Sequence, residues 1–392
     1  MKKIKFLIIL LPLLSGCYNY RELNDLGITT AISIDYEENF KIKAQVINPV
    51  KQQDATSSGE PTFVNFDSEG KSIQEALRRI ILESPRQLYG SQLQLLILSE
   101  EVANNHLEEV LDFCLRDPEF RSEFKVLIAK NDESLNGIAI QTLLENLSSS
   151  NIFESLETQE KKEGVSLSIT LNDLTNMYLN PYLEMTIPSM IVEGDIKEGE
   201  DENNITSTVS KARVMIDTTG IFKDKKLVGY LSMSESKALN LIKGELSDTI
   251  ITLDIKDGYI AFEPNRLNTK TEVDIKKNKV KITIEGFSII NEVTSKIDLK
   301  STKEIDKLEK ELNNYIKKTI NDSFNNIRNN YNTDVFGFQD LYYKTDAKYF
   351  KQNCQNWYQD IFPYLEIEVE SKIKLYEKGN TLGGIEYERE NQ

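Results

Sequence analysis

The first seventeen residues, MKKIKFLIILLPLLSGC, decide which part of the chain is free to fold and in which compartment. Three lysines precede the apolar run Phe6–Leu14, which is nine residues long. A helix needs about 20 apolar residues to cross a bilayer, and Pro12 weakens a spanning helix further. A basic start, a short apolar run and small residues after it are typical of a secretory signal peptide. We therefore expect residues 1–16 to be removed.

The end of this stretch predicts a lipid anchor. The order Leu14-Ser15-Gly16-Cys17 resembles the bacterial lipobox, in which a diacylglycerol is attached to the cysteine sulfur. Cleavage between Gly16 and Cys17 then leaves the lipidated, N-acylated cysteine as the first residue. The alternative is a chance cysteine after an ordinary signal. Two acyl chains hold a protein to a bilayer stably where one holds it only reversibly, so Cys17 predicts permanent attachment.

The charge of the chain excludes some partners. The formal net charge is −16 at pH 7. A nucleic-acid partner would require a basic stripe on the protein surface, and binding to anionic lipid through one face would require a polybasic surface. With 39% hydrophobic residues, the chain can bury a proper core. We expect an anchor made by lipid and no nucleic-acid partner.

Two cysteines remain after Cys17. A disulfide between Cys114 and Cys354 is compatible with the sequence but not required by it, since small disulfide-rich scaffolds carry many more cysteines. Cys114 shares one helical face with Leu107, Val110 and Leu111, which favours a buried free thiol. Cys354 is open to either role.

The first half alternates between strand and helix patterns, an α/β arrangement. A Ser72–Glu75 capping box opens a helix that ends at Pro85, and the apolar run Leu93–Leu98, interrupted only by Gln94, predicts a strand buried on both faces. We also expect strands at Gly27–Asp35, Phe40–Asn48, 61–66, Phe124–Ala129 and Tyr182–Val192, with helices at His106–Leu115, Asp132–Leu147 and 166–180. Residues 148–165 show little pattern, and Pro188 suggests an edge strand.

The second half predicts an antiparallel sheet packed on a long helix. Residues 196–206 are acidic and lack aromatics, as in a linker, so we expect a signal peptide at 1–16 and domains at 17–195 and 207–380. Apolar residues recur every three or four positions from Lys303 to Tyr331, giving one face that suits a core helix better than a coiled coil. The expected strands are a hairpin at 209–232, a meander at Thr249–Phe262, Thr269–Ile275 and Val280–Ile289, and a final strand at 364–379, with a short helix at Glu235–Ile242. The fold class is α+β with several domains.

Catalytic motifs are missing from the sequence. His106 is the single histidine, and its neighbours suit a helix start better than a catalytic or metal site. No phosphate-binding or dinucleotide-binding glycine motif occurs, and no calcium loop, so we expect no cofactor and no metal. A surface hydrolase with a carboxylate pair stays open, since only spatial separation identifies such a pair. The aromatic segments 336–350 and 356–365 suit a core better than a ligand groove.

Several segments together resemble one family, the Ger(x)C lipoproteins, the C subunits of nutrient germinant receptors in spore-forming bacteria. The resemblance runs from Cys17 to the final strand. Its pieces are CYNYRELNDLGITTAISID at 17–35, RQLYGSQLQLLILSEEVA at 86–103, LDFCLRDPEFRSEFKVLIAK at 111–130, DTTGIFKDKKLVGYLS at 217–232, and the region from DVFGF to Trp357. Their order and spacing across the whole chain carry the resemblance.

The resemblance implies a non-enzymatic membrane role. Such proteins are lipoproteins on the outer face of the spore inner membrane, assembled with integral-membrane A and B subunits, and the complex detects small nutrients. The resemblance implies a multi-domain α+β fold. It also implies a scaffold or coupling role for this subunit, with germinant recognition mainly in the A and B subunits. The alternatives are a surface-anchored cell-wall hydrolase and a solute-binding lipoprotein. The germinant, the partner-facing surface and the stoichiometry are left open.

Overall fold

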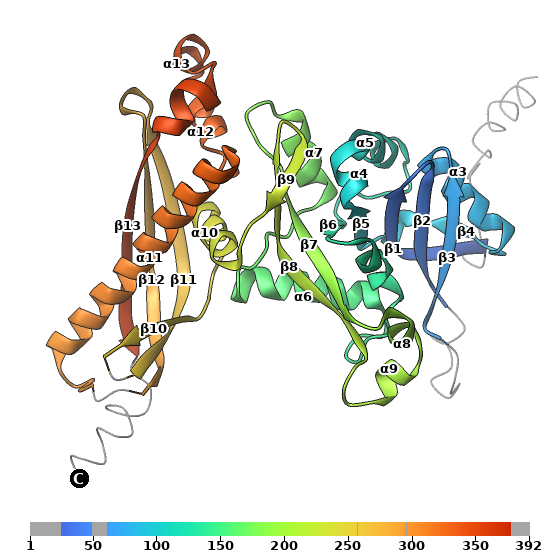
Figure 1. The fold of residues 1–392 in the computed structure, drawn as a ribbon, viewed down its shortest axis with the longest axis horizontal. Helices are drawn as coiled ribbons and strands as arrows, with labels where there is room; N and C mark the ends of the chain where they lie inside the picture. Colours follow the sequence, from blue (N-terminus) through green and yellow to red (C-terminus); the bar gives the residue numbers. More distant parts are fainter. Residues whose placement is uncertain (1–24, 49–60, 257, 295–296, 378–392) are drawn as a thin grey trace, which may run out of the picture.

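Two β-sheets divide the molecule, one in each half of the chain. The structure, a computed structural model, describes residues 25–48, 61–256, 258–294 and 297–377. A nine-stranded sheet lies toward one end of the long axis and a four-stranded sheet at the other, with helix α10 (Met233–Lys243) between them (Figure 1). The α+β fold expected from the sequence is confirmed.

The first sheet has a parallel centre with antiparallel flanks. Its order is β3-β2-β1-β5-β6-β7-β8-β9, and β4 pairs with the beginning of β1. Neighbours from β1 through β5 and β6 to β7 run parallel, which requires helical crossovers between them. The strands are β1 (Leu26–Tyr36), β2 (Phe40–Ile47), β3 (Phe63–Gly70), β4 (Gln87–Tyr89), β5 (Leu95–Ser99), β6 (Lys125–Ala129), β7 (Thr186–Gly194), β8 (Ala212–Lys223) and β9 (Lys226–Tyr230).

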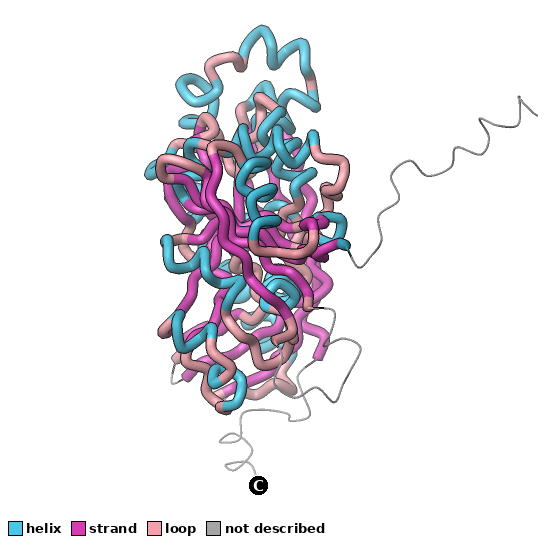
Figure 2. The backbone as a smooth tube through the Cα atoms, turned by 90° about the vertical axis from the view of Figure 1, so that its right-hand side faces the viewer, coloured by secondary structure: helices cyan, strands magenta, loops and turns pink. Residues whose placement is uncertain are grey.

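Helices cover both faces of this sheet, as the view along it shows (Figure 2). Leu96 and Leu98 of β5 pack in the core shared by α3 (Ile73–Arg79), α4 (Glu100–Asn105), α5 (Leu107–Arg116) and α7 (Leu171–Leu179). Leu95 and Ile97 pack on the opposite face with α6 (Ser148–Lys162). Every residue of β5 is buried, which confirms the prediction made from the apolar run at 93–98.

One predicted helix is wrong. Residues 132–147 form only the short 3₁₀ helix η5 (Asp132–Ala139), and the real helix, α6, occupies the segment whose pattern is weak. The buried Gln45 of β2 explains the shift, because its amide donates to Ile138 O at 2.7 Å and to Ser148 Oγ at 3.0 Å. The backbone between these two contacts is held by tertiary hydrogen bonds, so the helix starts at Ser148.

The acidic segment 196–206 is folded against the first sheet. It forms α8 (Ile196–Glu200) and α9 (Asn203–Thr206), which connect the paired strands β7 and β8. The amide of buried Asn204 donates to Gln141 O and Ala212 O and accepts from the backbone N–H of Lys211 and Ala212. The first sheet therefore continues past this segment as far as β9. A domain boundary at 196–206 stays a prediction.

The edge position predicted for Pro188 is wrong. Strand β7 lies inside the sheet between β6 and β8. Pro188 is accommodated because pairing with β6 involves only Ser189 and Met190, and because the register with β8 shifts between Pro188 and Met190. A residue without an N–H is tolerated at such an irregularity.

The second sheet packs on the predicted long helix. Helix α11 (Thr302–Tyr331) buries the apolar face expected from its spacing, including Leu312, Ile320 and Phe324. The strand order is β10-β11-β12-β13, formed by β10 (Ile251–Ile255), β11 (Gly258–Asp274), β12 (Lys279–Val293) and β13 (Glu366–Glu377). The predicted single strand Thr249–Phe262 is wrong, because it is divided between β10 and the beginning of β11, two antiparallel neighbours. The predicted strand Thr269–Ile275 is the end of β11. Strand β13 runs parallel to β12, because the helical crossover α11–α13 reverses the direction of the chain before it returns to the sheet.

The two aromatic segments near the end of the chain form core, as predicted. Tyr342, Phe350, Trp357 and Phe362 are buried. They follow α11 through α12 (Phe338–Thr345) and α13 (Ala347–Asn353). The aromatic side chains therefore fill the interior of the carboxyl-terminal part instead of lining a ligand groove.

The same region joins the two halves of the molecule. Tyr358 donates to Glu184 Oε1 at 2.7 Å, and Thr333 donates to Phe222 O at 2.7 Å. Beside them, burial raises the pKa of the Asp334 carboxyl to about 6. Polar contacts at this junction thus link the strands before α10 to the helices after α11.

The outer edge of the second sheet is covered by two side chains of α11, Asn313 and Glu309, and the Glu309 carboxylate accepts a hydrogen bond from Leu375 N at 3.1 Å. Asn313 of α11 accepts a hydrogen bond from Ile373 N at 2.8 Å and donates to Ile373 O at 2.9 Å. Strand β13 is the last strand of its sheet, and unpaired edge groups invite association with other chains.

We expect Asn313→Ala to lower the free energy of unfolding by about 1–3 kcal/mol, because two partly buried backbone groups lose their partners. Urea denaturation followed by circular dichroism measures this change. Asn321→Ala is the matched control, since the hydrogen bond that the Asn321 amide donates, to Lys317 O, stays within its own helix. Equal effects of the two substitutions would contradict the assigned role of Asn313.

Candidate functional site: a groove between α3 and α5

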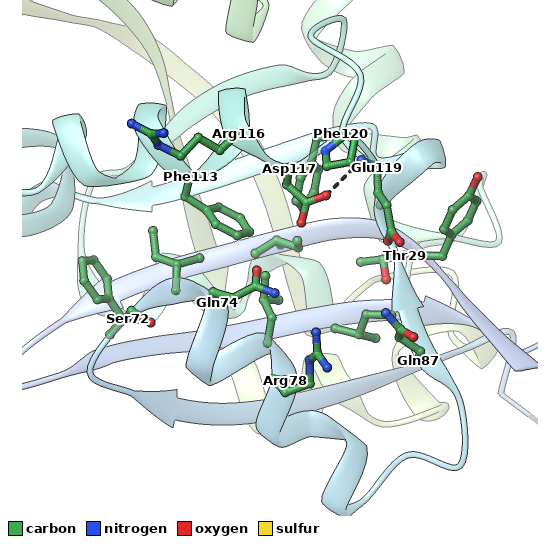
Figure 3. A pocket seen from close by; sticks show the side chains of 18 of the residues that line it. Thr29, Ser72, Gln74, Arg78, Gln87, Phe113, Arg116, Asp117, Glu119 and Phe120 are labelled. Atoms are coloured by element: carbon green, nitrogen blue, oxygen red, sulfur yellow. Dashed lines mark hydrogen bonds between the residues drawn. The ribbon is translucent and has the colours of Figure 1, made fainter. Parts of the chain in front are cut away.

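A groove of about 1320 Å³ lies between α3 and α5 over the beginning of β1 (Figure 3). Thr29 and Ile32 of β1 form part of its floor, and α3 and α5 form its two walls. Small-molecule pockets usually enclose about 300–1,000 Å³. This groove is therefore larger than the usual small-molecule pocket.

The α3 wall is set by its cap and its buried face. Ser72 accepts a hydrogen bond from Glu75 N at 3.2 Å, which confirms the predicted start of the helix, although the Glu75 carboxylate accepts from Lys71 N and not from Ser72 N. Ile73 is buried against the sheet. Gln74 and Arg78, one turn apart, are exposed and line the groove (Figure 3).

The α5 wall follows from its amphipathic pattern. Val110 and Cys114 are buried beneath the helix, and Phe113 and Arg116 line the groove. The guanidinium of Arg116 donates to both carboxylate oxygens of Asp112, at 2.8 and 2.7 Å, and this hydrogen bonding lowers the pKa of Asp112.

A tight turn after α5 closes one end of the groove. The Asp117 carboxylate accepts a hydrogen bond from Glu119 N at 2.9 Å (Figure 3), and the turn brings Phe120 back beside Phe113 at 5.4 Å between ring centroids. Gly90 on the facing segment permits this approach, because a Cβ atom there would lie 2.6 Å from the Phe120 ring. A side chain at position 90 would displace Phe120.

The lining carries cations without partners in an otherwise acidic protein. Within the ranges that the structure describes, Lys71, Arg78 and Arg121 form no ion pair with a carboxylate, and all three line the groove. Four acidic side chains also line the groove. Asp112 and Glu109 are engaged by Arg116 and His106, and the Asp117 carboxylate accepts a hydrogen bond from Glu119 N. The three cations are therefore the part of the lining that can accept negatively charged groups.

His106 lies at the other end of the groove in a structural position. It is the N-cap residue of α5, its ring lies 3.7 Å from that of Tyr36, and its Nδ1 is 3.2 Å from the Glu109 carboxylate. The side chains next to it therefore hold the ring in place, in agreement with the helix-start role predicted for this residue. No cluster of three or more His, Cys, Asp or Glu side chains suited to a metal ion occurs among the described residues.

The three cysteines differ in what the structure says about them. Cys17 is outside the described residues, so its lipidation stays a prediction. Cys114 and Cys354 are both buried and unpaired. Burial raises the pKa of the Cys114 thiol to about 12, so this thiol is unreactive at neutral pH.

Over the same described ranges, no helix combines the length and the apolar composition needed to cross a bilayer. The long α11 carries a charged outer face and belongs to the core of the second half.

Comparison with known proteins decides the family. Residues 19–192 match the model described as spore germination protein N-terminal domain, and residues 217–379 match the spore germination B3/GerAC-like C-terminal model. The chain belongs to this spore germination family. The family resemblance inferred from the sequence is thereby confirmed.

Individual relatives of the family match along nearly their full length. Spore germination protein KC of Bacillus subtilis is 28% identical, over 95% of this chain and 93% of that protein. Spore germination protein B3 of the same organism is 22% identical, over 96% of this chain and 98% of that protein. The crystal structure of the GerBC protein shares the fold, with a TM-score of 0.53 at 18% identity, over 88% of this chain and 96% of that chain.

Sequence reasoning did not identify the groove. Two segments that carried the family resemblance, 86–103 and 111–130, contribute Tyr89, Gly90, Phe113 and Phe120 to it. The α3 residues that face them could not be recognised as groove residues from the sequence, because exposed Gln and Arg side chains are common on helices.

Proposed function

We propose that this chain is a lipid-anchored, non-enzymatic subunit of a spore nutrient germinant receptor. It sits on the outer face of the spore inner membrane as a scaffold or coupling subunit beside integral-membrane A and B subunits. One observation carries the proposal: a spore germination family member has the lipobox-like order Leu14-Ser15-Gly16-Cys17 directly after a basic start and a short apolar run. Membership supports the role in germination, and the cysteine supports the anchor.

The anchor would hold the groove close to the bilayer. Nine residues lead from Cys17 to Leu26, and an extended chain spans at most about 3.6 Å per residue, so Leu26 stays within about 32 Å of the lipid. Leu26 itself lines the groove. Confinement to the membrane surface raises the effective concentration of membrane partners without any new contact.

The groove is the surface we assign to those partners. Its volume exceeds that of a small-molecule pocket, and its free cations, Lys71, Arg78 and Arg121, suit an acidic loop of an integral-membrane subunit. Charge complementarity of this kind mainly increases association rate and specificity.

The alternative functions receive less support. A solute-binding lipoprotein would enclose one nutrient in a pocket of ordinary size. The matched family models and relatives are described as spore germination proteins.

Co-purification from spore membranes tests the proposed assembly. The full-length chain with a carboxyl-terminal affinity tag is extracted in mild detergent, and the bound proteins are identified by mass spectrometry. We expect two integral-membrane proteins in constant ratio to the tagged chain. Recovery of the chain without membrane proteins, or degradation of purified peptidoglycan by the chain, would contradict the proposal.

A further inference from the structure

Two large aliphatic side chains protrude at the end of α3. Ile81 is 43% exposed and Leu82 is 86% exposed, whereas Ile80 beside them is 1% exposed. The three residues form η3 (Ile80–Leu82), which directly continues α3. Ile80 thus fixes the turn to the core while its neighbours point outward. We call Ile81 and Leu82 the apolar tip.

Basic side chains flank the apolar tip. Arg78 and Arg79 precede it and Arg86 follows it, and residues 71–90 contain four basic and two acidic side chains in a chain of net charge −16. Arg79 is held in place by Glu75 and by Glu69 O, while Arg78 and Arg86 have no carboxylate partner among the described residues. The net charge excludes a broad polybasic face, but this small region is a local exception.

The tip lies at the end of the molecule where the described chain begins. Strand β4 follows the tip after four residues and pairs Gln87 with Leu26, the first residue of β1. In Figure 1 the α3 and β4 labels mark the end of the long axis opposite the second sheet. The tether of at most about 32 Å from Cys17 therefore reaches the bilayer from beside the tip.

We propose that the apolar tip inserts into the interface of an anionic phospholipid bilayer, with Arg86 at the lipid phosphates. Aliphatic side chains surrounded by basic ones are the composition that binds such interfaces. This second contact would orient the anchored lobe and hold the groove, which Arg78 and Ile81 also line, along the membrane surface. The tether argument rests on the proposed function, but the lipid contact itself requires no acyl chain.

Vesicle flotation with the unlipidated mature chain tests this inference separately from the anchor. The protein is residues 17–392 with Cys17→Ser, which retains every described element, and the vesicles contain phosphatidylglycerol and phosphatidylcholine in equal amounts. We expect partitioning onto these vesicles to fall about tenfold in Leu82→Asp. Arg86→Glu should weaken binding as well, and added salt should reduce binding of the unsubstituted protein.

The matched control is Leu144→Asp, because Leu144 is 90% exposed but lies in the loop before α6. This control should bind vesicles like the unsubstituted protein. The inference is overturned if the unsubstituted protein stays unbound, if Leu82→Asp binds equally well, or if Leu144→Asp loses as much binding. A protein that lacks the lipid anchor in spores but still binds vesicles through the tip would refute the proposed function and leave this inference standing.

Discussion

Replacing Cys17 with alanine is expected to remove the protein from the spore membrane fraction and to abolish its contribution to nutrient-triggered germination. The variant loses the diacylglyceryl group and the N-acyl chain, and the remaining apolar run of nine residues is too short to span a bilayer. We expect the membrane-bound fraction to fall at least tenfold, since even one acyl chain holds a protein only weakly. Immunoblots of fractionated spores and the optical density after nutrient addition measure the two effects.

Cys114→Ala is the matched control for this substitution. Cys114 is buried in α5 and unpaired, so its loss removes one packed sulfur atom and costs only about 1 kcal/mol of stability. This variant should remain in the membrane fraction and support germination. Equal loss from the membrane in both variants would point to misfolding and contradict the anchor.

Filling the groove is the second substitution with a large expected effect. Gln74 is exposed on the groove face of α3, so Gln74→Trp should change the free energy of unfolding by no more than about 0.5 kcal/mol. The indole would occupy space that we assign to a partner segment. We expect at least a tenfold drop in co-purified membrane subunits and slower germination, with membrane attachment unchanged.

Gln352→Trp provides the comparison at a site away from the groove. Gln352 is likewise an exposed glutamine in a short helix, α13. The Gln352→Trp variant should co-purify with the membrane subunits and support germination like the unsubstituted protein. If Gln74→Trp behaves like Gln352→Trp, the groove is not the surface that contacts the membrane subunits.

Much of the fold follows from patterns confined to short stretches of sequence. The apolar run at 93–98 predicted a strand buried on both faces, and β5 is buried throughout. The three- and four-residue spacing after residue 303 predicted α11 and its buried face. In these elements the local pattern and the tertiary contacts favour the same structure.

Errors occurred where distant side chains decide the local structure. Gln45 in β2 bonds to Ile138 O and to Ser148 Oγ, more than ninety positions away in sequence, and thereby fixes where α6 begins. No local pattern reports that contact. The edge-strand prediction from Pro188 was wrong for a similar reason. Whether a strand inside a sheet can contain a proline depends on its register with both neighbouring strands.

The groove could not be predicted from sequence patterns, and the reason is physical. Its lining comes from β1, α3, the segment around Gly90 and the end of α5, which only the fold brings together. Its polar side chains look like ordinary solvent-exposed residues, and Phe120 lies in it only because Gly90 leaves room. The anchor, in contrast, was predicted from four consecutive residues because the lipobox is a linear signal.

The mass of the mature amino terminus tests the central claim most directly. Protein extracted from spore membranes is digested, and its first peptide is analysed by mass spectrometry. The account predicts a chain that begins at Cys17 and carries a diacylglyceryl group on sulfur and an acyl group on nitrogen. A chain that retains Met1, or one that begins elsewhere with no added lipid mass, would contradict it.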